Sequence, residues 1–225
     1  LEGGIGVIGQ ILADAVRRHG GKVLFRQEVN QIRRTGNIYQ VTTKRQEQFT
    51  ADVLVANLPP WNIRSLLQEN APTKLRQLPA QPQDGWGAFL LYLAVDATAV
   101  PIDFPLHHQI VAQEPLGEGN SIFLSFSPEW DQGRAPAGQR IITVSTHTQL
   151  QPWWQARAQG KDCYEERKQL YQQKMLRVAT ERLPWLHEAI RFSMTGTPVT
   201  FHRLTRRHLG WVGGFPQTSL WRTWA

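Results

Sequence analysis

Three glycines near the start of the chain match a motif that binds phosphate groups. Gly4, Gly6 and Gly9 satisfy the pattern G-x-G-x-x-G, and Glu28 follows about 20 residues later, where a ribose-binding acid belongs. In that motif a strand leads into the glycine turn, so that the phosphate meets the N-terminus of a helix. Only three residues precede Gly4. The motif is therefore incomplete, and the plain start of a helix is the alternative interpretation.

The histidines and serines form no recognisable catalytic set. No cysteine, aspartate or glutamate stands at ligand spacing from the histidines, so core or surface positions are favoured over metal binding. The histidines considered are His107, His108, His147, His202 and His208. The chain has no G-x-S-x-G nucleophile motif. Catalytic residues stay unknown at this stage, and no metal site is expected.

Three other side chains have both a chemical and a structural interpretation. Asp131 and Arg134 either form a structural ion pair in a loop or face a substrate tunnel, and the structural pair is favoured. Cys163 is the single cysteine and lies in an acidic, helical stretch that does not activate a thiol. A catalytic thiol is therefore not expected.

The composition indicates a globular protein. Hydrophobic residues make up 41% and charged residues 19% of the 225 residues. The absence of an apolar run of about 18 residues argues against a membrane-spanning helix, and the composition argues against disorder. We expect a cytoplasmic protein or one peripheral to a bacterial membrane. The sequence contains no recognisable nucleic-acid-binding motif, so no nucleic-acid partner is expected.

Positive charge gathers at the end of the sequence. Residues 201–225 contain no acid and hold four arginines, which are Arg203, Arg206, Arg207 and Arg222. The same stretch contains Trp211, Trp221 and Trp224. Such a tail can attract an anionic membrane surface or nucleic acid. A solvated turn with its tryptophans in the core is the favoured interpretation.

The first seventy residues show the pattern of a helix, short strands and a second helix. Apolar residues recur at helical spacing from Ile5 to Val16, and Arg17 to Gly21 is typical of a helix C-terminus. The apolar run Asp52–Ala56 predicts a strand buried on both faces, and Pro59–Pro60 precedes a helix over 61–67. The other predicted elements are strands at 22–25 and 29–33 and a hairpin turn at 35–37 that leads into 38–43.

The remaining residues predict a mostly antiparallel sheet with helices. Prolines and glycines separate runs of strand-forming residues, and a long helical stretch covers 162–183 before Pro184. The predicted strands are 86–95, 107–111, 121–126, 140–145 and 189–194, and 198–208 is a basic, helical segment. Trp61, Trp86, Trp153 and Trp154 either line an apolar tunnel or belong to the core, and the core is favoured.

The order of these segments resembles the middle of the phytoene-desaturase and amine-oxidase superfamily of FAD enzymes. The resemblance is carried by the double-glycine helix, the Gly20–Gly21 strand start, Glu28–Ile32, the hairpin and Ala51–Pro59. Ser125–Asp131 with Arg134–Gly138, and Thr205–Gly214, resemble segments of carotenoid desaturases, nearest to the carotenoid C-3',4'-desaturase type. The N-terminal fingerprint and C-terminal glycine motif of that superfamily have no counterpart here, so we expect a central segment of a longer chain.

The resemblance implies an α+β (mixed α/β) fold in two parts. Residues 1–70 are expected to be part of the FAD-binding domain. Residues 71–225 are expected to form the substrate-binding domain, with its antiparallel sheet, and the start of the return to the FAD-binding domain. Val29 occupies the position whose backbone groups lie against the adenine of FAD in the superfamily. Ala56 and Asn57 are weaker cofactor-binding candidates, because they follow the predicted strand at its carboxyl end.

The expected function of the parent protein is FAD-dependent desaturation of an apolar, carotenoid-like polyene. The segment alone is expected to be inactive and not to bind FAD stably, because the missing N- and C-terminal parts complete the cofactor site. A carotenoid isomerase or an amine oxidase of the same superfamily is the alternative enzyme. A non-catalytic lipid- or membrane-binding module, with the basic tail as its active surface, is the alternative of another class.

Overall fold

The computed structural model describes residues 2–77 and 85–213. The chain divides into a smaller compact unit, Ile8–Gln83, and a larger one made of Leu1–Val7 with Asp84–Ala225. Helix α1 (Gly6–Arg18) crosses the division after Val7. The units divide near residue 84, whereas the sequence places the domain boundary at 70/71. In the part of the chain that is described, no helix is long and apolar enough to cross a membrane.

The smaller unit contains a three-stranded antiparallel sheet in the order β1-β2-β3. Its strands are β1 (Val29–Thr35), β2 (Ile38–Thr43) and β3 (Gln48–Ala51). The predicted hairpin is confirmed, because Thr35 pairs with Ile38 across a turn in which Gly36 has a φ of 62°. Helix α2 (Pro60–Leu67) packs on β1 and is followed by η1 (Gln68–Asn70) and α3 (Thr73–Gln77).

Two predicted strands are wrong. Residues 22–25 and 52–56 form no strand and belong to no sheet. Phe25 is 69% exposed and Val55 is 87% exposed, so neither segment buries its apolar side chains. A strand is stabilised by cross-strand partners and a covered face. The described residues place no strand beside either segment, and apolar composition alone does not create one.

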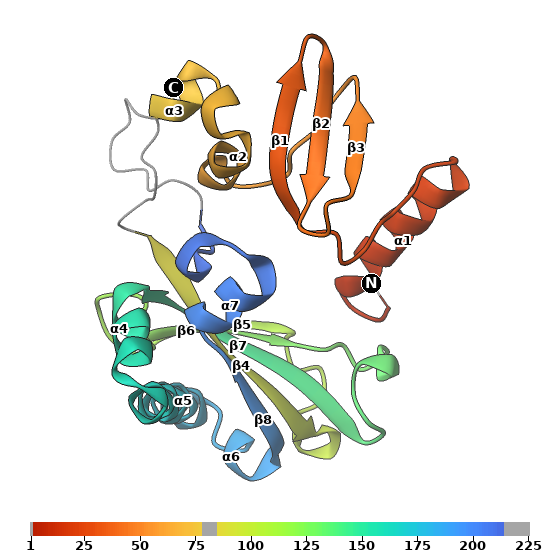
Figure 1. Cartoon of the computed structure of the whole chain (residues 1–225). Coiled ribbons are helices and arrows are strands. Elements are labelled where there is room, and N and C mark those ends of the chain that lie inside the picture. The colour runs from red at the N-terminus through yellow and green to blue at the C-terminus, as the bar shows by residue number, and fades with distance from the viewer. Residues whose placement is uncertain (1, 78–84, 214–225) are drawn as a thin grey trace. The chain divides into compact units, whose positions relative to one another are not determined.

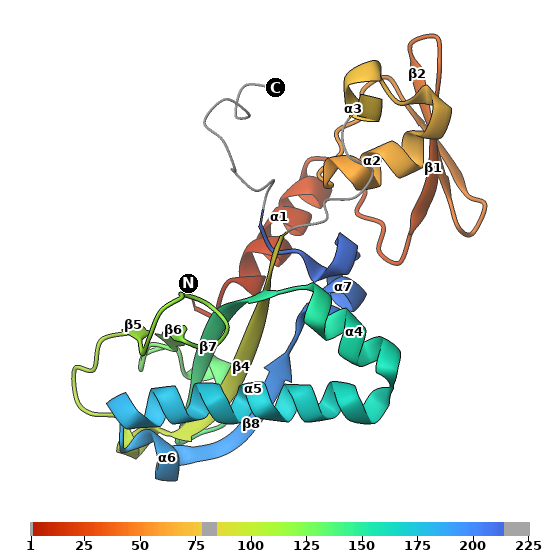
Figure 2. The same cartoon turned by 90° about the vertical axis from the view of Figure 1, so that its left-hand side faces the viewer.

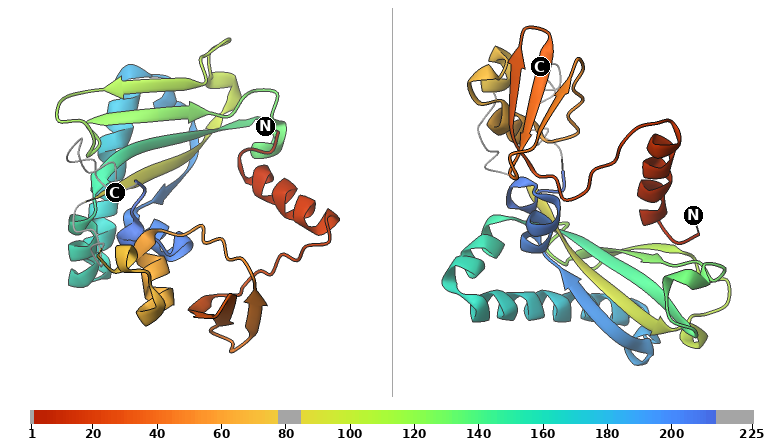
Figure 3. Two further views of the ribbon diagram at one scale, coloured as in Figure 1. Left: turned by 90° about the horizontal axis from the view of Figure 1, so that it is seen from above. Right: turned by 45° about the vertical axis from the view of Figure 1, so that its right-hand side comes forward.

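The larger unit is a five-stranded antiparallel sheet covered on one face by helices. The strand order is β5-β6-β7-β4-β8, with the long strands β7 and β4 near the centre. Figure 2 shows α5 running along one face of the sheet, and the views of Figure 3 place α4 on that side as well. The predicted strands and the long predicted helix of this unit are confirmed. The strands are β4 (Trp86–Asp96), β5 (His107–Val111), β6 (Ser121–Phe126), β7 (Gln139–Gln149) and β8 (Ile190–Gly196).

The helices of the larger unit follow and interrupt these strands. Helix α4 (Gln151–Gln159), which the sequence did not predict, is joined by Gly160 to α5 (Lys161–Arg182). The segment predicted at 198–208 forms α7 (Pro198–Thr205) and a short turn. The other helical segments are η2 (Ala97–Ala99), η3 (Gln132–Arg134), α6 (Leu186–Ala189) and η4 (His208–Gly210).

The core lies between the sheet and the helices α4, α5 and α6. Alternate residues of β4 point into it, and Phe89, Leu91 and Leu93 have no exposed surface. From the helices, the side chains of Trp153 and Met175 are also fully buried. Trp153 stacks on Phe89 with their ring centroids 5.4 Å apart. Trp153 is therefore a core residue and does not line a tunnel.

The loop between β5 and β6 is clamped to α5 and to the end of β7. Residue Glu118 has a φ of 52°, and its carboxylate accepts hydrogen bonds from the hydroxyls of Tyr171 and Thr148 and from the Gln149 amide. The Lys174 ammonium donates to the carbonyl oxygen of Glu118 at 2.7 Å. Trp153 Nε1 donates to Thr148 Oγ1 at 3.0 Å, which connects the clamp to the core. Burial and the Glu118 carboxylate raise the pKa of Tyr171 to about 12.

Substitution of Leu93 by alanine tests the packing of the core. Leu93→Ala leaves a cavity in the middle of β4, and we expect the free energy of unfolding to fall by about 2–5 kcal/mol. The matched control is Leu170→Ala on α5, where the leucine is 59% exposed and a change within about 0.5 kcal/mol is expected. Urea denaturation of both variants measures the difference. Equal losses would show that the sheet is not packed as described.

Alkaline titration tests the clamp. The pKa of Tyr171 in the folded state is raised to about 12, so the unfolded chain releases this proton first as the pH increases. The free energy of unfolding should therefore decline from about pH 10 to pH 12, and Tyr171→Phe should remove this part of the decline. Denaturation curves of both proteins at several pH values measure this decline in the free energy of unfolding. An unchanged pH dependence in Tyr171→Phe would contradict the clamp.

Candidate functional site

The face of the five-stranded sheet that points away from α4 and α5 carries a continuous set of side chains. Strand register places directly paired residues on the same face. One row across the sheet is Gln109, Phe123, Ser145, Leu90 and Gly196. The adjacent row is His107, Ser125, Thr143, Tyr92 and Met194. We call the ten residues of these two rows the open face.

The open face combines large apolar side chains with small or polar ones and is partly exposed. Phe123 is 41% exposed and Met194 is 53% exposed, and neighbouring Phe192 on β8 is 59% exposed. Small hydroxyl side chains, Thr143 and Ser145, lie on β7 between the strands that carry Phe123 and Tyr92. Adjacent strands are about 4.8 Å apart, so the strands that carry those two aromatic residues are roughly 10 Å apart. Exposed apolar side chains with small side chains between them suit a long, flat, apolar molecule.

Aromatic and glycine contacts limit the edges of the open face. The ring of His107 stacks on Phe123 with centroids 5.7 Å apart, and Trp86 meets His147 edge to face at 6.5 Å. At edge strand β8, the backbone of Gly196 lies against the ring of Phe201 on α7, which a Cβ at that position would meet at 3.9 Å, an ordinary contact distance. The face therefore has aromatic side chains at both edges of the sheet.

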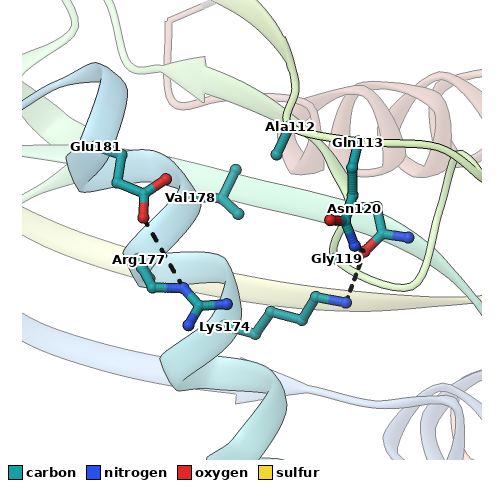
Figure 4. Close-up of a pocket in the computed structure, with 8 residues that line it drawn as sticks. All are labelled: Ala112, Gln113, Gly119, Asn120, Lys174, Arg177, Val178 and Glu181. Atoms are coloured by element: carbon teal, nitrogen blue, oxygen red, sulfur yellow. Dashed lines mark hydrogen bonds and ion pairs between the residues drawn. The ribbon is translucent and has the colours of Figure 1, made fainter.

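A hollow of about 260 Å³ lies on the other side of the larger unit, between the clamped loop and α5 (Figure 4). Its polar side chains bind one another: Lys174 Nζ donates to Asn120 Oδ1 at 2.7 Å, and Gln113 Nε2 donates to the same oxygen at 3.0 Å. Arg177 lies 4.0 Å from Glu181 at the rim. These mutual contacts indicate that the hollow is a structural part of the clamp.

The glycine motif starts a helix. The Val7 amide donates to the Gly4 carbonyl at 3.3 Å, and Gly6 and Gly9 lie within α1 itself. Glu28, the candidate ribose acid, has its carboxylate 2.7 Å from Lys44 Nζ. Residues 2–5 form no strand before the helix. These observations agree with the interpretation of Gly4–Gly9 as a helix start and give no support to a phosphate loop.

The predicted cofactor-binding residues all lie in the smaller unit. Val29 is the first residue of β1, an edge strand of its sheet, and is half-buried. Ala56 is half-buried and Asn57 is exposed, in the irregular segment that leads to α2. The strand whose carboxyl end was expected to place Ala56 and Asn57 is not formed, so that argument for them is lost. Their segment still leads into α2, which packs on β1.

An unsatisfied polar atom lies close to Val29 in the sequence. The amide oxygen Oε1 of Gln27 is buried and has no hydrogen-bond partner. Buried polar atoms are usually hydrogen-bonded, so an orphaned one indicates a missing group. Edge-strand backbone at Val29 and an unused amide oxygen at Gln27 fit a ligand with both hydrogen-bond donors and acceptors, such as an adenine ring.

Asp131 and Arg134 form the structural pair favoured by the sequence. The side chain of Asp131 is fully buried, and its Oδ1 accepts a hydrogen bond from the Gly3 amide at 3.0 Å. Its Oδ2 lies 3.7 Å from Nε of Arg134. The pair therefore holds the segment before α1 against the loop that follows β6, within the larger unit.

The remaining candidate residues make structural contacts, are partly exposed or lie outside the described residues. Trp211 is buried, whereas Arg222, Trp221 and Trp224 lie outside the described residues. Trp154 Nε1 donates to the Leu209 carbonyl, and burial lowers the pKa of His208, with a smaller effect from His202. Trp61 is half-buried on α2 in the smaller unit, and Trp86 is 46% exposed at the start of β4.

Within residues 2–77 and 85–213, no three His, Cys, Asp or Glu side chains gather into a group able to hold a metal ion. Cys163 is exposed at the start of α5.

The sequence patterns did not predict the open face. The run Trp86–Asp96 is almost continuously apolar, so it hides which residues face the helices. Strand β6 carried the better signal, because Ser121, Phe123 and Ser125 alternate with Ile122, Leu124 and Phe126. Pairing of β6 with β7, and of β7 with β4, could not be read from these segments one at a time.

Known proteins show where this chain belongs. It is 26% identical over 230 residues to prolycopene isomerase 2, chloroplastic, of an Oncidium hybrid cultivar. The alignment covers 96% of this chain and 37% of that relative. Prolycopene isomerase, chloroplastic, of Daucus carota is also 26% identical, over 96% of this chain and 36% of its own length. The chain thus spans little more than a third of these relatives.

Solved structures share the fold. Cyclohexylamine oxidase from Brevibacterium oxydans matches 83% of this chain and 36% of its own, with a TM-score of 0.53 and 13% identity. An oxidoreductase from Methanosarcina mazei matches 87% of this chain and 43% of its own, with a TM-score of 0.55 and 15% identity. Such likeness confirms the mixed α+β fold. Residues 1–149, well over half of the chain, match the family model described as flavin containing amine oxidoreductase. The chain therefore belongs to the flavin containing amine oxidoreductase family.

Proposed function

We propose that this chain is the central part of a flavin-dependent enzyme that isomerises a carotenoid-like polyene. The larger unit binds the polyene on the open face. The smaller unit contributes the adenine side of the flavin site. The parts of the protein outside this chain complete that site, so the segment alone is inactive.

The open face is the observation that carries the proposal. A polyene is long, flat and apolar, and it gains binding free energy by removing apolar surface from water. Phe123, Leu90, Tyr92 and Met194 provide such surface on three strands. Thr143 and Ser145 on β7 place only small side chains between them, which leaves room for a flat ligand. The face offers no acidic side chain, which is consistent with an uncharged ligand.

The relatives favour isomerisation over desaturation. Prolycopene isomerases of an Oncidium hybrid cultivar and of Daucus carota align with nearly all of this chain. Desaturation, predicted from the segments Ser125–Asp131 and Thr205–Gly214, is the second candidate. The two reactions are distinguishable, because desaturation removes two hydrogen atoms from the polyene and isomerisation leaves its mass unchanged. Oxidation of an amine, which the family description suggests, is the third candidate reaction.

The start of β1 fits the flavin. The backbone of Val29 on the edge strand and the orphaned Oε1 of Gln27 are the groups that would hold the adenine ring. Asn57 and Ala56 are further candidates by their place before α2. When bound, FAD would supply the cofactor chemistry of the reaction, which in an isomerisation leaves the polyene neither oxidised nor reduced overall. The residues of this chain bind the polyene, orient it and exclude water.

Substitution on the open face tests the proposal in the whole protein that contains this chain. Phe123→Asp puts a carboxylate where the apolar polyene is to lie, and we expect kcat/KM for polyene isomerisation to fall at least about tenfold. Chromatography of polyene isomers measures the rate, and mass spectrometry separates isomerisation from desaturation.

Leu170→Asp is the matched control, because it places the same charge on an exposed leucine of α5. This variant should retain the activity of the unmodified protein. Equal losses in both variants would contradict a role for the open face. Oxidation of an amine, with polyene isomers unchanged, would replace the proposal by the amine alternative.

A further inference from the structure

The positive charge of the chain is concentrated in the smaller unit. Residues 8–83 contain eleven lysines and arginines against five aspartates and glutamates, a net charge of +6. The whole chain has a net charge of +7, so the larger unit with its arginine-rich tail contributes only +1. Acidic residues elsewhere in the larger unit offset the tail. The unit that the sequence had not singled out is therefore the basic one.

Four of these cations lie toward one end of the smaller unit. Arg33 and Arg34 are exposed on β1, next to the hairpin turn, and Lys74 and Arg76 are exposed on α3. Figures 1 and 2 place α3 toward the hairpin end of the sheet. Ile38, the first residue of β2, is 50% exposed beside the turn. We call these five residues the basic end.

The cations of the basic end form no ion pairs with the described residues of the smaller unit. Arg34 donates through Nε to the Gly36 carbonyl at 3.1 Å and lies over the ring of Tyr39, which keeps its charge at the surface. By contrast, Arg17 and Lys44 of the same unit are ion-paired with Asp14 and Glu28. Among the described residues no ion pair engages Arg33, Arg34, Lys74 or Arg76.

We propose that the basic end docks the protein on an anionic lipid surface. Clustered cations attract anionic headgroups, and an exposed aliphatic residue beside them gains free energy by entering the headgroup region. The basic end has both properties, because Ile38 is exposed beside the turn that follows Arg33 and Arg34. The choice of a lipid surface over another polyanion rests on the proposed function, because a polyene substrate resides in a bilayer.

Vesicle sedimentation with the whole protein tests the proposal. Vesicles of phosphatidylcholine with phosphatidylglycerol should bind the protein, pure phosphatidylcholine vesicles should bind it far less, and salt should weaken binding. The double variant Arg33→Gln/Arg34→Gln should weaken binding to the anionic vesicles roughly tenfold or more.

The double variant Arg182→Gln/Arg203→Gln is the matched control, since it removes the same charge from exposed arginines of the larger unit. It should bind like the unmodified protein. Equal weakening in both variants, equal binding to neutral vesicles, or no binding to anionic vesicles would overturn the proposal. Duplex DNA that displaces the protein from vesicles at matched phosphate concentration would also overturn it, in favour of a nucleic-acid partner.

Polyene turnover in detergent micelles separates this proposal from the enzymatic one. Activity in micelles with no vesicle binding leaves the enzyme proposal standing and removes the docking surface. Vesicle binding through the basic end without turnover of any polyene supports docking on anionic lipid. It removes the reason to link that docking to a polyene substrate.

Discussion

Side chains of an antiparallel sheet alternate between its two faces, and the larger unit depends on this constraint. The helices α4, α5 and α6 can cover only one face of β5-β6-β7-β4-β8, so Phe89, Leu91 and Leu93 form a core with Trp153 and Met175. The intervening residues must point the other way. A core on one side of the sheet therefore creates the open face on the other, and ligand binding there needs no separate pocket.

The clamp and the Asp131–Arg134 pair fix loops at the ends of the strands of that sheet. Glu118 joins the β5–β6 loop to α5 and β7, and Asp131 joins the loop after β6 to the segment before α1. Both carboxylates lie outside the open face, so they stabilise the sheet without placing charge against an apolar ligand. The basic end belongs to the smaller unit and the open face to the larger one.

Local patterns in the sequence predicted the elements that local physics determines. β5 and β6 alternate cleanly, and α5 has acids toward its start and cations toward its end, so their bounds agree with the structure. Helix α4 was missed because its apolar residues form no helical stripe. Residues 22–25 and 52–56 look like strands in composition, but a strand also needs neighbours that composition does not reveal. The clamp could not be predicted either, because Glu118 and Tyr171 are 53 residues apart.

The central claim is that the open face holds the polyene. A crystal structure of the whole protein with its flavin and a bound polyene tests this claim most directly. Our account predicts density for the polyene along β7, between Phe123 and Tyr92 and over Thr143 and Ser145. A polyene bound elsewhere, with this face covered by other parts of the protein chain, would contradict it.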